Sequence, residues 1–174
     1  MNPWLVIVIV IACLIVLSFI SGLFFFFLLK KQSPKVDAEL EKMLAYEKER
    51  GSKLIDKVKL LYSKGLRYDK DSIDKMEEYF NNLENLDSTG RAQYKNMVDF
   101  SALFLYKVYN EDKRLSKYIS EQEANYFKDF QKDSDLKYKA YNKKASVYNT
   151  FLNMPFTKMV MRMFKQDTSP KAVL

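Results

Sequence analysis

Apolar residues fill the N-terminal part of the chain without interruption. From Trp4 to Leu29 there is no Asp, Glu, Lys or Arg, and almost every residue is Val, Ile, Leu or Phe. At ~1.5 Å of rise per residue, these 26 residues form a helix of ~39 Å, against a hydrocarbon core of ~30 Å. The stretch therefore predicts a transmembrane helix with some tilt, within an anchor segment of residues 1–31.

This stretch has three possible interpretations: a cleaved signal peptide, a lipoprotein signal or an uncleaved membrane anchor. A cleaved signal peptide needs a basic start and a small-residue cleavage site, and residues 1–3 carry no Lys or Arg. The run Val10-Ile11-Ala12-Cys13 resembles a lipoprotein cleavage box, but apolar sequence follows Cys13 where a polar linker is expected. An uncleaved anchor is therefore favoured. Ser18 and Gly22 have the spacing of a small-residue helix contact, and we interpret this as a chance pairing.

The flanks of the stretch predict its orientation. Lys30, Lys31 and Lys35 follow it, and positively charged flanks stay on the cytoplasmic side of a membrane. We therefore expect a cell-membrane protein with a short N-terminus outside and its C-terminal domain in the cytoplasm. The residues expected in or beside the membrane are Trp4, Phe24, Phe25, Phe26, Phe27, Lys30 and Lys31.

Beyond the anchor, apolar residues recur every three or four positions with Lys and Glu between them, as in amphipathic helices. Ser33-Pro34 is expected to separate the anchor from the next helix, with Ser33 as its cap. Gly65 is expected to end that helix, Asp71-Ser72 and Asp87–Gly90 to start later ones, and Pro155 to end the last long one. The predicted helices cover residues 35–64, 72–85, 92–110, 112–130, 134–153 and 156–165.

The predicted fold class is all-α. No segment shows the alternation of a strand, and only four Gly and four Pro occur in 174 residues. We expect an N-terminal single transmembrane helix followed by an elongated antiparallel helical bundle. The bundle is predicted over 32–165, with a flexible C-terminal tail over 166–174.

The composition removes several classes of enzyme. The chain has no His and a single Cys, which excludes Cys/His zinc sites, Ser-His-Asp triads, Cys-His dyads and an internal disulfide. The glycines are scattered, so no phosphate-binding loop is present. We expect no catalytic residue, cofactor, metal or small-molecule substrate.

Charged side chains mostly alternate in sign, which is typical of solvated helix surfaces. The net charge of +7 leaves anionic-lipid or nucleic-acid binding through a basic face as an alternative, although scarce Arg argues against specific nucleic-acid recognition. A di-metal bundle site would need Glu-x-x-His motifs. The carboxylate pairs are therefore expected on the solvated surface; they are Glu39/Glu41, Glu47/Glu49, Glu77/Glu78 and Glu121/Glu123.

The segment 156–165 combines an apolar and a basic face. It allows three interpretations: the segment caps the end of the bundle, contacts the membrane as an interfacial helix, or docks a partner. Capping is favoured. The apolar face consists of Phe156, Met159, Val160, Met163 and Phe164, and the basic face of Lys158, Arg162 and Lys165.

The C-terminal part resembles the LemA family. Its residues Tyr141-Asn142, then Val147-Tyr148-Asn149, Pro155 and an apolar helix ending at Phe164 match the end of that family, where two Tyr-Asn pairs precede Phe-Pro and a short amphipathic helix. Met154 stands where the family often has Phe. An earlier family signature is matched only loosely, by Arg50, Leu54-Ile55 and Val58, with Asp56 and Lys57 in place of its proline and asparagine.

The resemblance implies a bacterial, membrane-tethered helical bundle with its bulk in the cytoplasm and no established catalytic activity. Tyr141 and Tyr148 lie seven residues apart and so share a helix face. We expect them to pack into the bundle while Asn142 and Asn149 bond a neighbouring helix; a surface recognition strip is the alternative. The function expected is a non-enzymatic scaffold or interaction module with a protein partner or a second copy, and an enzyme of unrecognised type is less favoured.

Overall fold

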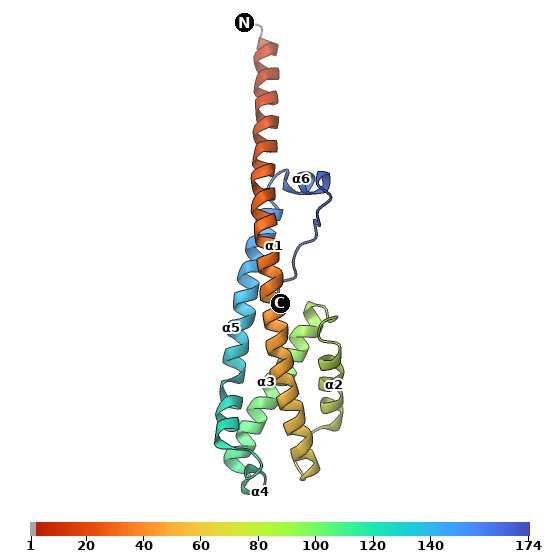
Figure 1. Ribbon diagram of the computed structural model, residues 1–174, viewed down its shortest axis with the longest axis vertical. Coiled ribbons are helices and arrows are strands. Elements are labelled where there is room, and N and C mark those ends of the chain that lie inside the picture. Colours follow the sequence, from red (N-terminus) through yellow and green to blue (C-terminus); the bar gives the residue numbers. More distant parts are fainter. Residues whose placement is uncertain (1–2) are drawn as a thin grey trace. The chain divides into compact units, whose positions relative to one another are not determined.

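The computed structural model describes residues 3–174, and every regular element among them is a helix (Figure 1). The predicted all-α fold class is confirmed. The helices are α1 (Pro3–Ser63), α2 (Lys70–Asn81), α3 (Ser88–Glu111), α4 (Lys113–Ser116), α5 (Glu121–Leu152) and α6 (Thr157–Met163).

The chain packs into two compact units. The first unit joins the chain up to Glu39 with Tyr141–Val173, and the second unit comprises Leu40–Ala140. These boundaries differ from the predicted segments 1–31, 32–165 and 166–174. Helices α1 and α5 each contribute one part to both units.

The predicted break at Ser33-Pro34 is wrong, because α1 continues through it with Pro34 inside the helix. Proline lacks an N–H and costs a helix interior about 3 kcal/mol. Leu29 and Val36, on either side of it, are both buried within the first unit, and this packing keeps the chain helical. Ser33 is therefore not a cap; its hydroxyl donates to Asp37 one turn later, at 3.4 Å.

The predicted end of this helix at Gly65 is confirmed. Gly65 has φ +96°, a left-handed conformation that glycine adopts without a side-chain clash. The Leu66 N–H donates to the Leu61 carbonyl at 2.9 Å, and the Gly65 N–H donates to Tyr62 at 3.1 Å. These two bonds form a Schellman motif, and the buried side chains of Leu61 and Leu66 flank it.

Aspartate side chains cap two helices of the second unit. Asp87 accepts from the Gly90 N–H at 2.7 Å, which confirms the predicted start of α3 there. The cap of α2 is Asp69, which accepts from the Ser72 N–H at 2.9 Å, so α2 starts before the predicted Asp71-Ser72.

The two helices predicted over 112–130 and 134–153 have different boundaries in the structure. Asp112 caps the short α4, and Ser120 and Glu123 form a capping box that starts α5. Helix α5 then runs without a break through the polar residues 131–133. Phe130 and Ser134, one turn apart, are both buried, so the same face of the helix continues across the predicted break.

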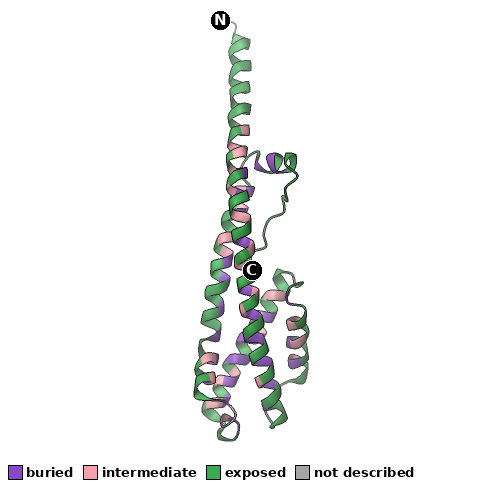
Figure 2. Cartoon of the chain, in the orientation of Figure 1, coloured by how far each residue is buried: buried purple, intermediate pink, exposed green. Residues whose placement is uncertain are grey.

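Helices α1 and α5 run antiparallel within each unit. In the second unit Glu47 contacts Ser134, and Arg50, further along α1, contacts the earlier Phe130 on α5. The apolar core of this unit also includes α2, α3 and α4, and the buried positions face one another across it (Figure 2). Its largest fully buried apolar side chains are Leu54, Leu61, Met76, Leu83, Tyr94, Leu105, Phe127 and Phe130.

Candidate membrane-interface site

The N-terminal part of α1 is long and apolar enough to cross a membrane, and it is the one helix of this kind in residues 3–174. Only 6% of its most apolar 18-residue window is buried, whereas a core helix of a soluble protein would be mostly buried (Figure 2). Trp4 is 74% exposed. The part of the chain that the structure describes therefore leaves this apolar surface uncovered.

The four phenylalanines at the end of the apolar stretch have two different environments. Phe24 and Phe27 are 60% and 64% exposed. Phe25 stacks on Phe151 at the end of α5, with ring centroids 5.8 Å apart. Phe26 is buried and stacks on Phe164, just after α6, at 4.8 Å. The helical repeat thus turns two of the four rings toward the protein.

Gly22 allows α6 to approach α1 closely. A Cβ atom at Gly22 would lie 3.0 Å from Cγ2 of Val160 and 3.2 Å from the carbonyl carbon of Phe156. Small residues permit this kind of backbone approach between helices. Gly22 therefore lies at a helix contact within the first unit, whereas the interpretation of the Ser18/Gly22 spacing as a chance pairing stays a prediction.

Residues with positive φ lie at both ends of α6. Phe156 has φ 62° and Lys165 has φ 52°, a conformation that costs a non-glycine residue about 1–2 kcal/mol. At the second end, the Gln166 N–H donates to Met161 at 2.9 Å and the Lys165 N–H to Arg162 at 3.0 Å, forming a Schellman motif. These turns shorten the predicted helix 156–165 to Thr157–Met163.

One face of α6 packs against the protein and a second apolar face stays open. Thr157, Val160 and Met161 are buried. The other large apolar residues of this segment are between 42% and 62% exposed; they are Phe156, Met159, Met163 and Phe164. The basic residues Lys158, Arg162 and Lys165 are exposed as well. Packing on α1 thus accounts for only part of the predicted apolar face.

The residues of the LemA resemblance hold the C-terminal tail. The Tyr141 hydroxyl donates to the Ala172 carbonyl at 2.8 Å. The Asn149 amide donates to the Lys171 carbonyl at 2.7 Å and accepts from the Lys171 N–H at 2.8 Å. Tyr148 is buried, and its ring centroid lies 5.8 Å from the Lys171 ammonium nitrogen.

These contacts differ from the expected ones in the element that they bind. Asn149 bonds the backbone of the tail and not a neighbouring helix, while Asn142, on the same helix, is half-buried. The segment predicted as a flexible tail makes paired hydrogen bonds to α5.

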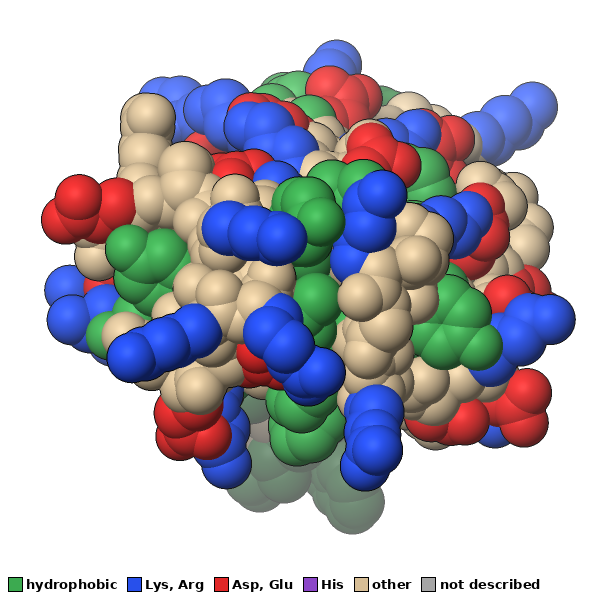
Figure 3. All heavy atoms as spheres, turned by 90° about the horizontal axis from the view of Figure 1, so that it is seen from below, with side chains coloured by type: hydrophobic (Ala, Val, Ile, Leu, Met, Phe, Trp, Pro, Cys, Tyr) green, Lys and Arg blue, Asp and Glu red, His purple; other side chains and the backbone are tan. Residues whose placement is uncertain are grey.

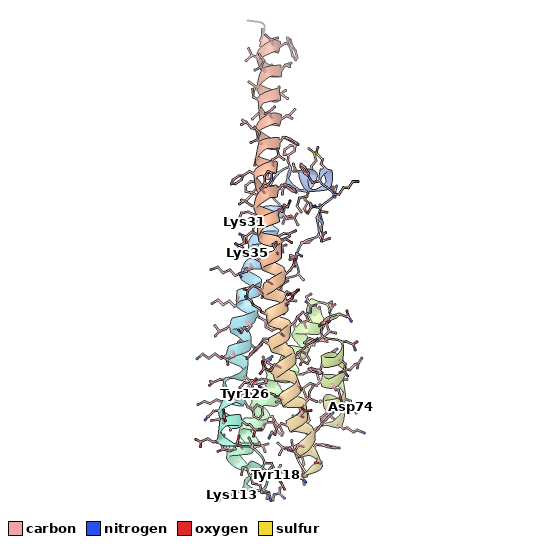
Figure 4. All side chains as sticks on the ribbon, viewed as in Figure 1. Lys31, Lys35, Asp74, Lys113, Tyr118 and Tyr126 are labelled. Atoms are coloured by element: carbon pink, nitrogen blue, oxygen red, sulfur yellow. The ribbon has the colours of Figure 1, made fainter. Side chains whose placement is uncertain are left out.

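Ion pairs add to this arrangement in the first unit. Lys171 pairs with Asp37 at 2.8 Å, and Lys144 of α5 pairs with Glu39 of α1 at 2.7 Å. Burial acts to lower the pKa of Lys171, but Asp37 outweighs it and the pKa lies above its ordinary value. Lys31 and Lys35 project from α1 just beyond the apolar stretch (Figure 4).

The second unit contains a buried ionic cluster that the sequence did not reveal. The Arg50 guanidinium donates from Nε to Glu47 and from Nη1 to Asp99, both at 2.8 Å. Nη1 also donates to the Phe130 carbonyl at 3.2 Å, and the guanidinium carbon lies 4.9 Å from the Phe130 ring centroid. Ser134 donates to the other oxygen of Glu47 at 3.1 Å. The cluster therefore joins α1, α3 and α5 within this unit.

A second cation reaches this cluster. Lys95 pairs with Asp99 at 2.7 Å and with the exposed Asp135 at 2.6 Å. Arg50 and Lys95 thus face the two buried carboxylates of Glu47 and Asp99. Burial acts to lower the pKa of Arg50, but these carboxylates outweigh it and the pKa is raised. Burial raises the pKa of Glu47, which Arg50 opposes only in part.

The tyrosines around the cluster do not supply a base. Burial raises the pKa of Tyr46 to about 12, and it also raises the pKa values of Tyr94 and Tyr138, so that all three hydroxyls stay protonated near neutral pH. The side chains of Glu47 and Arg50 have no solvent exposure. Carboxylates and tyrosines thus converge here, but in a closed core without access for a substrate.

The expectation that Glu47 lies on the solvated surface is therefore wrong. Glu47 occupies the apolar stripe of α1 four residues after Met43, and Arg50 lies four residues before Leu54. Charged residues at core positions of a helical stripe are the signal that indicates a buried pair.

An open apolar groove of about 280 Å³ lies in the second unit, between the start of α2 and α3. Phe100, at its edge, is 67% exposed. The other lining residues are Arg67, Tyr68, Asp69, Ser72, Met97 and Phe104.

No protein-family model, curated protein or solved structure matches this chain.

Replacing Arg50 with Met is expected to destabilise the second unit strongly. The change leaves the carboxylates of Glu47 and Asp99 buried without their cation, which typically costs about 3–5 kcal/mol. The measurement is urea unfolding of the full chain in detergent, followed by circular dichroism. Lys53→Met is the matched control, because Lys53 and its partner Glu49 are both exposed, and no measurable shift is expected. Equal unfolding midpoints for the two variants would contradict a structural role for the cluster.

Proposed function

We propose that this chain is a membrane-anchored, non-enzymatic helical scaffold of the LemA type on the cytoplasmic face of a bacterial membrane. The observation that carries the proposal is the uncovered apolar window of α1. Exposed apolar surface of this size is unfavourable in water, and a bilayer removes it from water at no cost in backbone hydrogen bonds because the segment is helical. The anchor concentrates the second unit at the membrane, where it recruits a protein partner or a second copy.

The lysines after the apolar stretch support the cytoplasmic location of the second unit. Three exposed lysines follow the apolar stretch of α1; they are Lys30, Lys31 and Lys35. Positive charges near the end of a transmembrane helix favour the cytoplasmic side. The short segment before the stretch, residues 1–2, lies outside the described residues, and its placement outside the cell is part of this proposal.

Two features of the second unit favour a binding role over catalysis. The cluster around Arg50 is closed to solvent, which leaves its carboxylates without access to a substrate. The groove beside Phe100 instead offers exposed aromatic surface, which is typical of protein-binding sites.

The surface charges favour a protein partner over nucleic acid. Asp and Glu side chains lie among the Lys and Arg side chains on the face seen in Figure 3. Nucleic-acid binding requires cations gathered in a patch or stripe.

The LemA relationship is part of the proposal and draws support from the C-terminal end of the chain. Tyr141, Tyr148 and Asn149, which carry the resemblance, make specific contacts to the tail in the first unit. Holding the C-terminal tail against α5 gives a physical reason for the Tyr and Asn residues at this spacing.

Cysteine labelling tests the orientation. With Cys13 replaced by Ala, Asn2→Cys should react with a membrane-impermeant maleimide in intact cells. Lys132→Cys, at an exposed site in the second unit, should react only after lysis. The reverse pattern of labelling would place the second unit outside and overturn the proposed location.

In-cell photo-crosslinking tests the scaffold. A photoreactive amino acid at Phe100 should give a discrete adduct, with a partner protein or a second copy, and the same amino acid at Lys132 should give little. A chain lacking residues 1–31 should give much less of the Phe100 adduct, because the anchor raises the local concentration. Equal adducts at Phe100 and Lys132 would contradict a dedicated interaction surface, and equal adducts with and without residues 1–31 would show that membrane placement is not part of recognition.

A further inference from the structure

We infer that α6 is a second membrane contact, an interfacial helix that places its open apolar face in the inner leaflet and its basic face among anionic lipid headgroups. The inference rests on the proposed anchoring of α1. It assigns a lipid ligand to the segment Phe156–Lys165, where Met159 and Met163 are 47% and 62% exposed.

The contact with α1 sets the depth of α6. A hydrocarbon core of ~30 Å corresponds to about 20 helical residues, so a helix entering at Trp4 leaves the core near residue 23. The α6 segment touches α1 at this level, with Val160 against Gly22 and Phe164 stacked on Phe26. It therefore lies at the boundary between acyl chains and headgroups.

The turns at the ends of α6 give it a suitable direction. The chain leaves α5 at Leu152, turns at Pro155 and Phe156, and turns again at Lys165. Figure 1 shows that α6 lies beside α1 with its axis at a steep angle to that of α1. A helix at a steep angle to a membrane-spanning helix lies roughly in the plane of the bilayer, which is the arrangement of an interfacial helix.

The side chains of α6 divide into three sectors around the helix. At 100° per residue, Thr157, Val160 and Met161 point toward α1, in agreement with their burial. Met159 and Met163 form the adjacent apolar sector, and both are exposed, as is Phe156 in the turn before the helix. Lys158 and Arg162 form the basic sector of the helix, and the exposed Lys165 follows in the turn after it.

This composition matches an anionic leaflet. No Asp or Glu occurs between Met154 and Gln166, so the basic sector is not neutralised within the segment. Each Lys or Arg near an anionic surface strengthens binding by about fivefold. The apolar sector lies at the same level of α1 as the exposed rings of Phe24 and Phe27, so the two surfaces meet the same lipid layer. This shared level favours lipid over a protein ligand.

Depth-dependent fluorescence quenching of the full chain in liposomes tests the inference. An environment-sensitive fluorophore is attached to the native Cys13 to report the anchor. In a Cys13→Ala background, Met163→Cys reports α6 and Lys132→Cys serves as the aqueous control; both positions are exposed. Lipids brominated near the middle of the acyl chain should quench Cys13, and lipids brominated near the headgroup end should quench Met163→Cys. Lys132→Cys should not be quenched.

Two changes distinguish the role of the basic sector from that of the apolar sector: a change in lipid charge, and reversal of the charges of the basic residues. Quenching at Met163→Cys should increase when phosphatidylglycerol replaces part of the phosphatidylcholine. The variant Lys158→Glu/Arg162→Glu/Lys165→Glu should lose this increase. The variant Lys128→Glu/Lys132→Glu/Lys139→Glu changes the net charge equally at exposed positions of the second unit and should retain it.

Each result has a defined meaning. If Cys13 is quenched and Met163→Cys is not, the anchor stands and the lipid contact of α6 is overturned, which leaves its open face for a protein. If Met163→Cys is quenched regardless of lipid charge and of the reversal, the role of the basic sector is overturned. If Cys13 itself is not quenched, the proposed anchoring fails and this inference fails with it.

Discussion

Exposed apolar surface on the N-terminal part of α1 is the physical constraint on which the proposed membrane anchoring depends. The chain itself covers only a small part of that surface, although the helix satisfies its own backbone hydrogen bonds. Water is a poor solvent for such a segment, whereas a bilayer suits it. This requirement underlies our interpretation of the flanking lysines, of the contacts of α6 and of the function of the protein.

In the second unit the unusual feature is the reverse: charged side chains are buried inside the protein. Arg50 is fully enclosed, and its hydrogen bonds to Glu47, Asp99 and the Phe130 carbonyl join three helices. A charge in such a place stabilises only one arrangement of its neighbours, because any shift that removes a partner leaves an unpaired ion in the core. The cluster therefore constrains the packing of these helices, and the side chains of Glu47 and Arg50 are closed to solvent.

Features with a local cause could be predicted from the sequence. The absence of charge from Trp4 to Leu29, the left-handed turn at Gly65 and the cap at Asp87 each depend on a few neighbouring residues. The continuity of α1 through Pro34 depends instead on the burial of Leu29 and Val36, which is a tertiary effect.

Features of the candidate site depended on partners distant in sequence. The burial of Glu47 depends on Ser134, which donates to it, and on Arg50, which also pairs with Asp99. No local pattern places Ser134 and Asp99 there. The same holds for Gly22, whose close neighbours come from the turn before α6. The sequence indicates that Asn149 forms a hydrogen bond, but it does not predict the partner in the tail, because irregular segments have no periodicity that predicts their path.

Extraction of cell membranes with alkaline carbonate tests the membrane anchoring of α1 most directly. This treatment releases peripheral proteins and leaves proteins with a spanning helix in the membrane. The full chain is expected to stay in the membrane pellet, whereas a chain lacking residues 1–31 is expected to be released by the treatment. Release of the full chain into the supernatant would contradict the membrane anchoring of α1.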